Sequence, residues 1–132
     1  MKKRVFINKK TGQNRPRFSK ADWEGIDGFP RIVCICGSGR FLSTMKLVEE
    51  ELTLKGEIVL MIGVNTKDVA RTESLEQYKA MLDELHLRKI DLADYVYVVN
   101  ENGYIGESTA NEIRYAKKTG KPILYHCDLK RI

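Results

Sequence analysis

The chain has 132 residues, which is the length of one domain and excludes a second catalytic domain. Hydrophobic residues make up 42%, and no apolar run approaches the roughly 20 residues that span a bilayer, so the composition predicts a folded chain without a membrane span. The formal net charge of +5 comes from residues 1–30, where eight basic side chains face three acidic ones. Residues 31–132 are electrically balanced, so nucleic-acid binding is open only to residues 1–30 and is not favoured.

The start of the sequence has no apolar stretch typical of a signal peptide, so we expect a cytoplasmic protein. Its three cysteines, Cys34, Cys36 and Cys127, are an odd number without Cys-x-x-Cys spacing. This spacing argues against a disulfide framework and against a structural zinc site, and no metal or cofactor is expected. We expect Cys34 and Cys36 to pack as small apolar residues in a reduced compartment.

The sequence changes character at Pro30. Residues 1–30 are polar and basic, contain the turn signals Thr11-Gly12 and Arg15-Pro16, and are predicted to form an arm or a small hairpin. Residues 31–132 alternate apolar runs with amphipathic stretches, and the runs predict strands at 32–36, 58–62, 95–99 and 122–125. Helices are expected where apolar residues recur at helical spacing: at Phe41, Met45, Val48 and Leu52, ending at Lys55-Gly56; at Leu75, Tyr78, Leu82 and Leu85; and over residues 108–118.

This alternation of strands and helices predicts an α/β fold. The expected architecture is a Rossmann- or flavodoxin-like three-layer sandwich with a parallel sheet of four to five strands in the order 2-1-3-4. In such sheets the ligand lies beyond the carboxyl ends of the strands, where the strand order reverses. The loops 37–40 and 100–107 follow the first and third strands, and each leads into a helix N-terminus that favours an anion.

The first of these loops has the composition of a phosphate cradle. Gly37 and Gly39 permit a close approach of the backbone, Ser38 can donate a hydrogen bond, and Arg40 can make a forked contact. The alternative is a tight turn between strand and helix in which Ser38 caps the helix. The four residues alone leave both interpretations open.

The second loop ends in a segment that contains Gly106, Ser108, Thr109 and Glu112. Ser108 or Thr109 is a good N-cap, and Glu112 could bond back to the helix start in a capping box. Alternatively, Glu112 faces the pocket beneath the first loop. A carboxylate placed there could attack a sugar carbon or stabilise an oxocarbenium ion.

Three sequence elements in this order resemble the nucleoside 2-deoxyribosyltransferases and their relatives that hydrolyse the N-glycosidic bond of (deoxy)nucleoside 5'-monophosphates. The elements are Cys36-Gly37-Ser38-x-Arg40, Ala93-Asp94, and Gly106-x-Ser108-Thr109-x-x-Glu112-Ile113-x-Tyr115-Ala116. The resemblance covers residues 31–126 and implies that Glu112 is the nucleophile that displaces the base from C1'. It also implies a homodimer or higher homo-oligomer, because relatives commonly complete the pocket from a neighbouring subunit.

The chain departs from the family pattern at three positions. His86 stands where the family has an aspartate, and it could donate a proton to the leaving base or could be a surface or packing histidine. Cys34 replaces a tyrosine that orients the glutamate, and Arg114 replaces a glycine. These changes keep open a second interpretation, a nucleotide-binding or sensor module without turnover.

Two further side chains are assigned from the sequence. Asp83 is expected on a solvated helix face. Tyr104, in the loop before the third helix, could stack on a base or could be an exposed loop residue without a function.

Overall fold

The computed structural model describes residues 29–65 and 75–127, so the predicted arm of residues 1–30 lies outside the described residues except for Phe29 and Pro30. In chain order the elements are β1 (Ile32–Gly37), α1 (Leu42–Leu54), β2 (Ile58–Leu60), α2 (Lys79–Leu92), β3 (Tyr95–Val99), α3 (Glu107–Lys118) and β4 (Ile123–Tyr125). Short 3-10 turns lie at η2 (Gly39–Phe41), η3 (Glu76–Tyr78) and η4 (Glu101–Gly103). No helix in these ranges combines the length and the apolar character needed to cross a bilayer.

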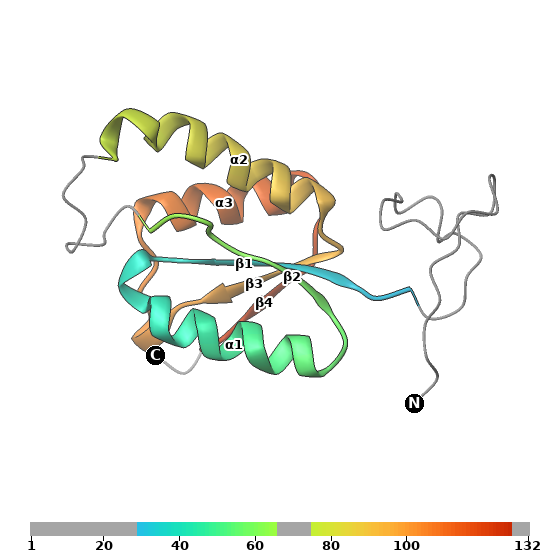
Figure 1. Ribbon diagram of the computed structural model, residues 1–132. Helices are drawn as coiled ribbons and strands as arrows, with labels where there is room; N and C mark the ends of the chain where they lie inside the picture. The colour runs from blue at the N-terminus through green and yellow to red at the C-terminus, as the bar shows by residue number, and fades with distance from the viewer. Residues whose placement is uncertain (1–28, 66–74, 128–132) are drawn as a thin grey trace, which may run out of the picture.

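The strands form a parallel four-stranded sheet in the order β2-β1-β3-β4 within the described ranges. Helix α1 covers one face, and α2 and α3 cover the other (Figure 1). The central strands β1 and β3 are continuous apolar runs, as expected for strands that are covered on both faces. The predicted three-layer α/β architecture and its strand order are confirmed.

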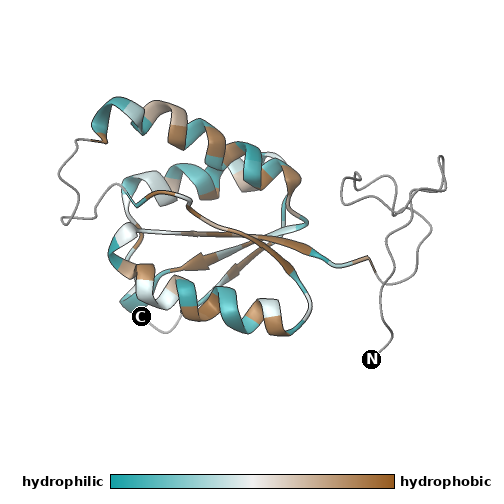
Figure 2. Ribbon diagram, in the orientation of Figure 1, coloured by the Kyte–Doolittle hydropathy of each residue, from teal (hydrophilic) through white to brown (hydrophobic). Residues whose placement is uncertain are grey.

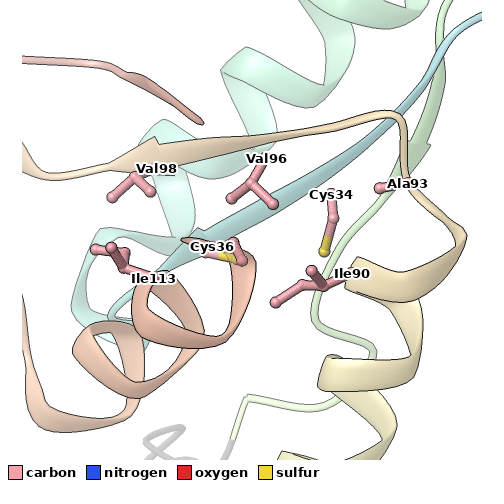
Figure 3. Packing of buried hydrophobic residues seen from close by; sticks show 8 residues of the cluster. Cys34, Cys36, Ile90, Ala93, Val96, Val98 and Ile113 are labelled. Carbon is pink, nitrogen blue, oxygen red and sulfur yellow. The ribbon is translucent and has the colours of Figure 1, made fainter. Parts of the chain in front are cut away.

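The core consists of two apolar layers, one on each face of the sheet. The layer between the sheet and α1 consists of Val33, Ile35, Met45, Val48, Leu52, Tyr95 and Val99. The layer between the sheet and the helices α2 and α3 consists of Cys34, Cys36, Ile90, Ala93, Val96, Val98, Ile113 and Ala116 (Figure 3). The division follows from the alternation of side chains along β1. The strands are mostly apolar, whereas the helices alternate apolar and polar residues (Figure 2).

Strand β2 is shorter than predicted. The sequence predicts residues 58–62, but the ladder with β1 ends at Leu60. Beyond that point Lys89 of α2 donates a hydrogen bond from Nζ to the Met61 carbonyl at 2.6 Å. A side chain from another element thus takes the place of a strand partner, and the chain leaves the sheet toward α2.

Helix α2 buries a different face from the one that its apolar residues predicted. Tyr78 lies in the preceding 3-10 turn and is 43% exposed, and Leu85 is 47% exposed. The buried residues of α2 are His86 and Ile90, four positions apart. Helix α2 is therefore rotated so that His86 points toward the sheet, which decides the composition of the site.

The loop after β3 is held by the buried side chain of Asn100. Its Nδ2 donates to the Cys127 carbonyl at 3.0 Å, and its Oδ1 accepts from the Cys127 amide at 2.8 Å. Asn100 is fully buried, so this pair of bonds joins the ends of β3 and β4 in a water-poor environment. The pair fixes the point from which the chain continues to α3.

Gly37 ends β1 at a point of close backbone approach. A Cβ at this position would lie 3.0 Å from the Val99 carbonyl oxygen and 3.1 Å from Met45 Sδ. We therefore expect Gly37→Ala to lower the free energy of unfolding by about 1–3 kcal/mol through overpacking, measured by urea denaturation. Gly63→Ala is the control, because a Cβ there meets only Lys89 Nζ, at 4.0 Å. Equal stability of the two variants would contradict the proposed packing constraint.

Candidate functional site

A pocket of about 620 Å³ lies at the carboxyl end of β1. It is enclosed by the loop after β1, the segment after β2, one face of α2, and the start of α3 with the loop before it. Its volume is in the range of small-molecule sites, and its place agrees with the ligand position in open parallel sheets.

The pocket brings together most of the residues that the sequence singled out. Its lining includes Gly37, Ser38, Gly39, His86, Gly106, Ser108, Thr109 and Glu112. Arg40 is not among the lining residues. It is exposed, and its guanidinium carbon lies 4.0 Å from the centre of the Tyr104 ring. Tyr104 itself lines the pocket and packs edge-on against Phe41. Arg40 therefore contacts a residue of the pocket lining without lining the pocket itself.

Ser38 adopts the capping role. Its Oγ accepts a hydrogen bond from the Arg40 amide at 3.4 Å, and it is the N-cap of η2. The expectation of a tight turn capped by Ser38 is confirmed, and the anion-binding interpretation of this loop stays a prediction. Within this loop, Gly37 and Gly39 are the residues that leave the backbone accessible from the pocket.

The predicted capping box at the third helix is wrong. Helix α3 begins at Glu107, its N-cap is Gly106, and no side chain caps it. Glu112 is therefore in the second helical turn, too far along to bond back to the helix start. It lies beside the buried residues Thr109 and Ile113, on the side of α3 that faces the sheet and α2.

Four side chains, Cys34, Cys36, His86 and Glu112, converge beside the pocket, and we call them the His86 cluster. His86 and Glu112 line the pocket, whereas the two cysteines are fully buried and do not line it. His86 Nε2 lies 3.6 Å from Cys34 Sγ, 3.3 Å from Cys36 Sγ and 3.4 Å from Glu112 Oε2. The side chain of His86 is 7% exposed and that of Glu112 is 15% exposed. His86 is therefore a core-facing histidine, so of the two positions considered for a histidine without a function, on the surface or packed in the core, the structure shows the second.

The cluster shifts the pKa values of its members in opposite directions. Burial raises the pKa of Glu112, and the nearby His86 offsets this only in part. Hydrogen bonding from Cys36 and the proximity of His86 lower the pKa of Cys34 to about 6, although burial opposes this. Burial alone lowers the pKa of His86, but Cys34 and Glu112 outweigh it and raise that pKa. Hydrogen bonding to Cys34 and burial raise the pKa of Cys36 well above its usual range.

Sequence reasoning missed three charged residues of the pocket. Lys79, Asp83 and Lys89 of α2 contribute to its lining, and Lys79 pairs with Asp83 at 2.8 Å. Asp83 is exposed, as expected for a solvated helix face, and it also lines the open pocket. Asp83 lies three residues before His86, so these side chains share a helix face once His86 is placed inward.

We compared the chain with protein-family models, curated proteins and solved structures, and none of these comparisons finds a significant match.

Replacing Glu112 by glutamine keeps the shape of the side chain and removes a buried charge. Folding raises the pKa of Glu112 above its ordinary value of 4.5, so its ionised form disfavours folding at higher pH, and the penalty vanishes below that value. At pH 7 we expect the melting temperature of Glu112→Gln to be a few degrees higher than that of the wild type, which corresponds to a gain in stability of about 1 kcal/mol. Below pH 4.5 the melting temperatures of the two proteins should converge.

The control for this comparison is Glu84→Gln, which alters an exposed carboxylate paired with Arg88 on α2 and should change the melting temperature little. Melting in metal-free buffer followed by circular dichroism measures both. A lower melting temperature for Glu112→Gln at pH 7 would show that the buried charge favours folding.

Proposed function

We propose that the protein cleaves the N-glycosidic bond of a nucleoside or a nucleoside 5'-monophosphate, as a hydrolase or as a 2-deoxyribosyltransferase. The observation that carries this proposal is the Glu112 carboxylate, which lies beside His86 in a pocket of nucleotide size that a glycine-rich loop also lines. The resemblance of the Gly106–Ala116 segment to the transferase family assigns the nucleophile to the same residue.

Glu112 has the environment of a nucleophile. Its Oε2 is buried, lies 3.4 Å from His86 Nε2, and has no hydrogen-bond partner among the described residues. In the proposed step this oxygen forms a bond to C1' while the bond from C1' to the base nitrogen breaks and its electron pair leaves with the base. Water or a second base then displaces Glu112 from C1'.

His86 is suited to protonate the leaving base. Its raised pKa keeps the imidazole protonated closer to neutral pH than an ordinary histidine. Its Nε2 lies 3.4 Å from the Glu112 carboxylate, and both residues line the pocket. A single substrate could therefore contact both groups, with the carboxylate at the sugar carbon and the imidazolium at the base.

Another part of the pocket lining is suited to the 5' side of the substrate. The Gly37–Gly39 loop and the N-terminus of α3 meet there, and free backbone amides at a helix start favour anions. Lys79 Nζ lies 3.4 Å from Ser108 Oγ at this helix start and adds a local positive charge. This arrangement supports a phosphate or hydroxyl at the end of the sugar away from Glu112.

Incubation of the protein with a panel of nucleosides and nucleoside 5'-monophosphates tests the proposal by chromatography of the free base. We expect Glu112→Gln to lower the rate of release by more than about 10³-fold, because the nucleophile is removed. We expect His86→Gln to lower it by about 10²-fold or more, because the proton donor is removed. Glu84→Gln, on the exposed side of α2, is the matched control and should retain the rate of the wild type.

No base release by the wild type, or equal release by Glu112→Gln, contradicts the proposed cleavage. If calorimetry then shows that a nucleotide binds and is recovered intact, the protein is a binding module, the second interpretation from the sequence.

The dependence of kcat/KM on pH tests the assignment of roles. Glu112 must be ionised, so activity should rise through a pKa above the ordinary value of 4.5. His86 must be protonated, so activity should fall through a pKa above the ordinary value of 6.5. The alkaline limb should disappear in His86→Gln, and an unchanged alkaline limb in that variant would rule out His86 as the proton donor.

A further inference from the structure

The His86 cluster has a second chemical character that the proposed cleavage does not use. Two sulfurs, an imidazole nitrogen and a carboxylate oxygen approach one another from three elements of the fold. Cys34 Sγ, Cys36 Sγ and His86 Nε2 all lie within 4.8 Å of one another, and Glu112 Oε2 lies 3.4 Å from the same Nε2. Thiolate, imidazole and carboxylate are the ligands that zinc prefers in proteins.

Each member of this group is positioned by regular secondary structure. Cys34 and Cys36 are alternate residues of β1 and therefore point to the same face, toward α2 and α3 (Figure 3). Helix α2 presents His86 to them, and α3 presents Glu112. The absence of Cys-x-x-Cys spacing does not count against a metal here, because that spacing suits a loop, whereas in a strand residues two apart share a face.

Hydrogen bonding alone does not satisfy the cluster. Nε2 of His86 carries at most one proton, yet three acceptor atoms lie 3.3 to 3.6 Å from it. Glu112 Oε2 is buried and has no hydrogen-bond partner among the described residues. An unsatisfied carboxylate oxygen in such a place is costly, and a bound cation would compensate it.

The distances from His86 Nε2 to its three neighbours match those in a tetrahedral metal site. With Zn–S near 2.3 Å and Zn–N and Zn–O near 2.0 to 2.2 Å, a tetrahedral angle places S and N about 3.5 Å apart and N and O about 3.4 Å apart. The separations in the cluster are 3.6 and 3.3 Å for S and N, and 3.4 Å for N and O. Cys34, Cys36 and His86 form a group of ligand atoms within 4.8 Å of one another and need little rearrangement to close around an ion. Glu112 meets this group at His86 Nε2 and would move toward the sulfur atoms to become the fourth ligand.

We propose that Cys34, Cys36 and His86 bind a zinc ion, with Glu112 as the fourth ligand. Two thiolates and an imidazole favour zinc over magnesium, calcium and manganese, which prefer oxygen ligands. His86 and Glu112 line the pocket, so the pocket gives the ion a path to the two buried cysteines. Two thiolates and a carboxylate leave one negative charge around Zn²⁺, and the charge of Lys89 acts on both Cys34 and His86.

Zinc binding is independent of the proposed cleavage, because it requires no substrate. It also has a consequence for that cleavage. Once Glu112 is a zinc ligand, its lone pair is no longer available to attack C1', and His86 must be neutral to bind the ion. A zinc-loaded protein should therefore release no base.

The sequence offers a matched control for each kind of ligand. It contains three cysteines and two histidines, so Cys127 and His126 are the only others of their kind. His126 Nδ1 lies 2.8 Å from the Tyr97 hydroxyl, and neither His126 nor Cys127 belongs to the pocket lining or to the His86 cluster. Cys127→Ser and His126→Gln therefore test for binding by any cysteine or histidine at all.

The experiment titrates zinc into the untagged full-length protein, reduced and stripped of metal, against a chromophoric chelator. We expect one zinc ion per chain, and we expect cobalt to give the charge-transfer absorption of thiolate ligands. Cys36→Ser and His86→Gln should weaken zinc binding by more than about 100-fold, beyond the loss expected for an outer-shell partner. Cys127→Ser and His126→Gln should bind as the wild type does.

The proposal is overturned if the wild type binds no stoichiometric zinc, if cobalt shows no thiolate absorption, or if the control variants lose binding as the cluster variants do. Circular dichroism establishes that each variant is folded, and the cobalt spectrum tests the ligands in the wild type if a variant does not fold. Because binding is measured without nucleotide, a protein that binds zinc and cleaves nothing contradicts only the proposed function, and the reverse result contradicts only the zinc site.

Discussion

The strict alternation of side chains along β1 is the constraint on which the rest of the structure depends. This central strand is covered on both faces, so every second residue must serve a different helix layer. Val33 and Ile35 fill the layer against α1, while Cys34 and Cys36 face α2 and α3. The strand ends at Gly37, where the chain passes close to Val99 and turns into the pocket loop. This one strand therefore contributes residues to both core layers and to the His86 cluster.

A polar cluster inside an apolar layer needs a physical explanation. The layer against α2 and α3 is otherwise made of residues such as Ile90, Val96 and Ile113, and apolar replacements for Cys34, Cys36 and His86 would pack there without unsatisfied groups. A partly satisfied buried network is less stable than an apolar core. Groups of this kind with shifted pKa values beside a pocket are typical of functional sites. In the His86 cluster, stable packing favours apolar side chains, whereas the proposed chemistry requires polar ones.

The sequence predicted the layers, the strand order and part of the pocket lining, because apolar runs and glycine-rich turns are local signals. It placed Glu112 correctly on the third helix, but with the wrong partner, since helix α3 begins at Glu107 and carries Glu112 past the capping position. It missed the rotation of α2, because Leu85 and His86 differ by one residue and only contact with β1 decides which of them is buried. Arg40 was placed in the pocket by sequence position, whereas its contact with Tyr104 depends on two loops meeting in space. Tertiary contacts of this kind leave no periodic signal.

The two proposals place opposite demands on the same four side chains. Cleavage needs an ionised Glu112 with a free lone pair and a protonated His86 that can give up its proton. Metal binding needs a neutral His86, two thiolates, and the same Glu112 lone pair. His86 Nε2 lies 3.3 to 3.6 Å from all three other groups, so the histidine and the two cysteines need little movement between the two states, whereas Glu112 would move toward the sulfur atoms. The states differ in protonation and in occupancy by a cation rather than in fold. Under the two proposals, substrate and zinc compete for Glu112, and the available zinc sets the fraction of protein that can act on a nucleotide.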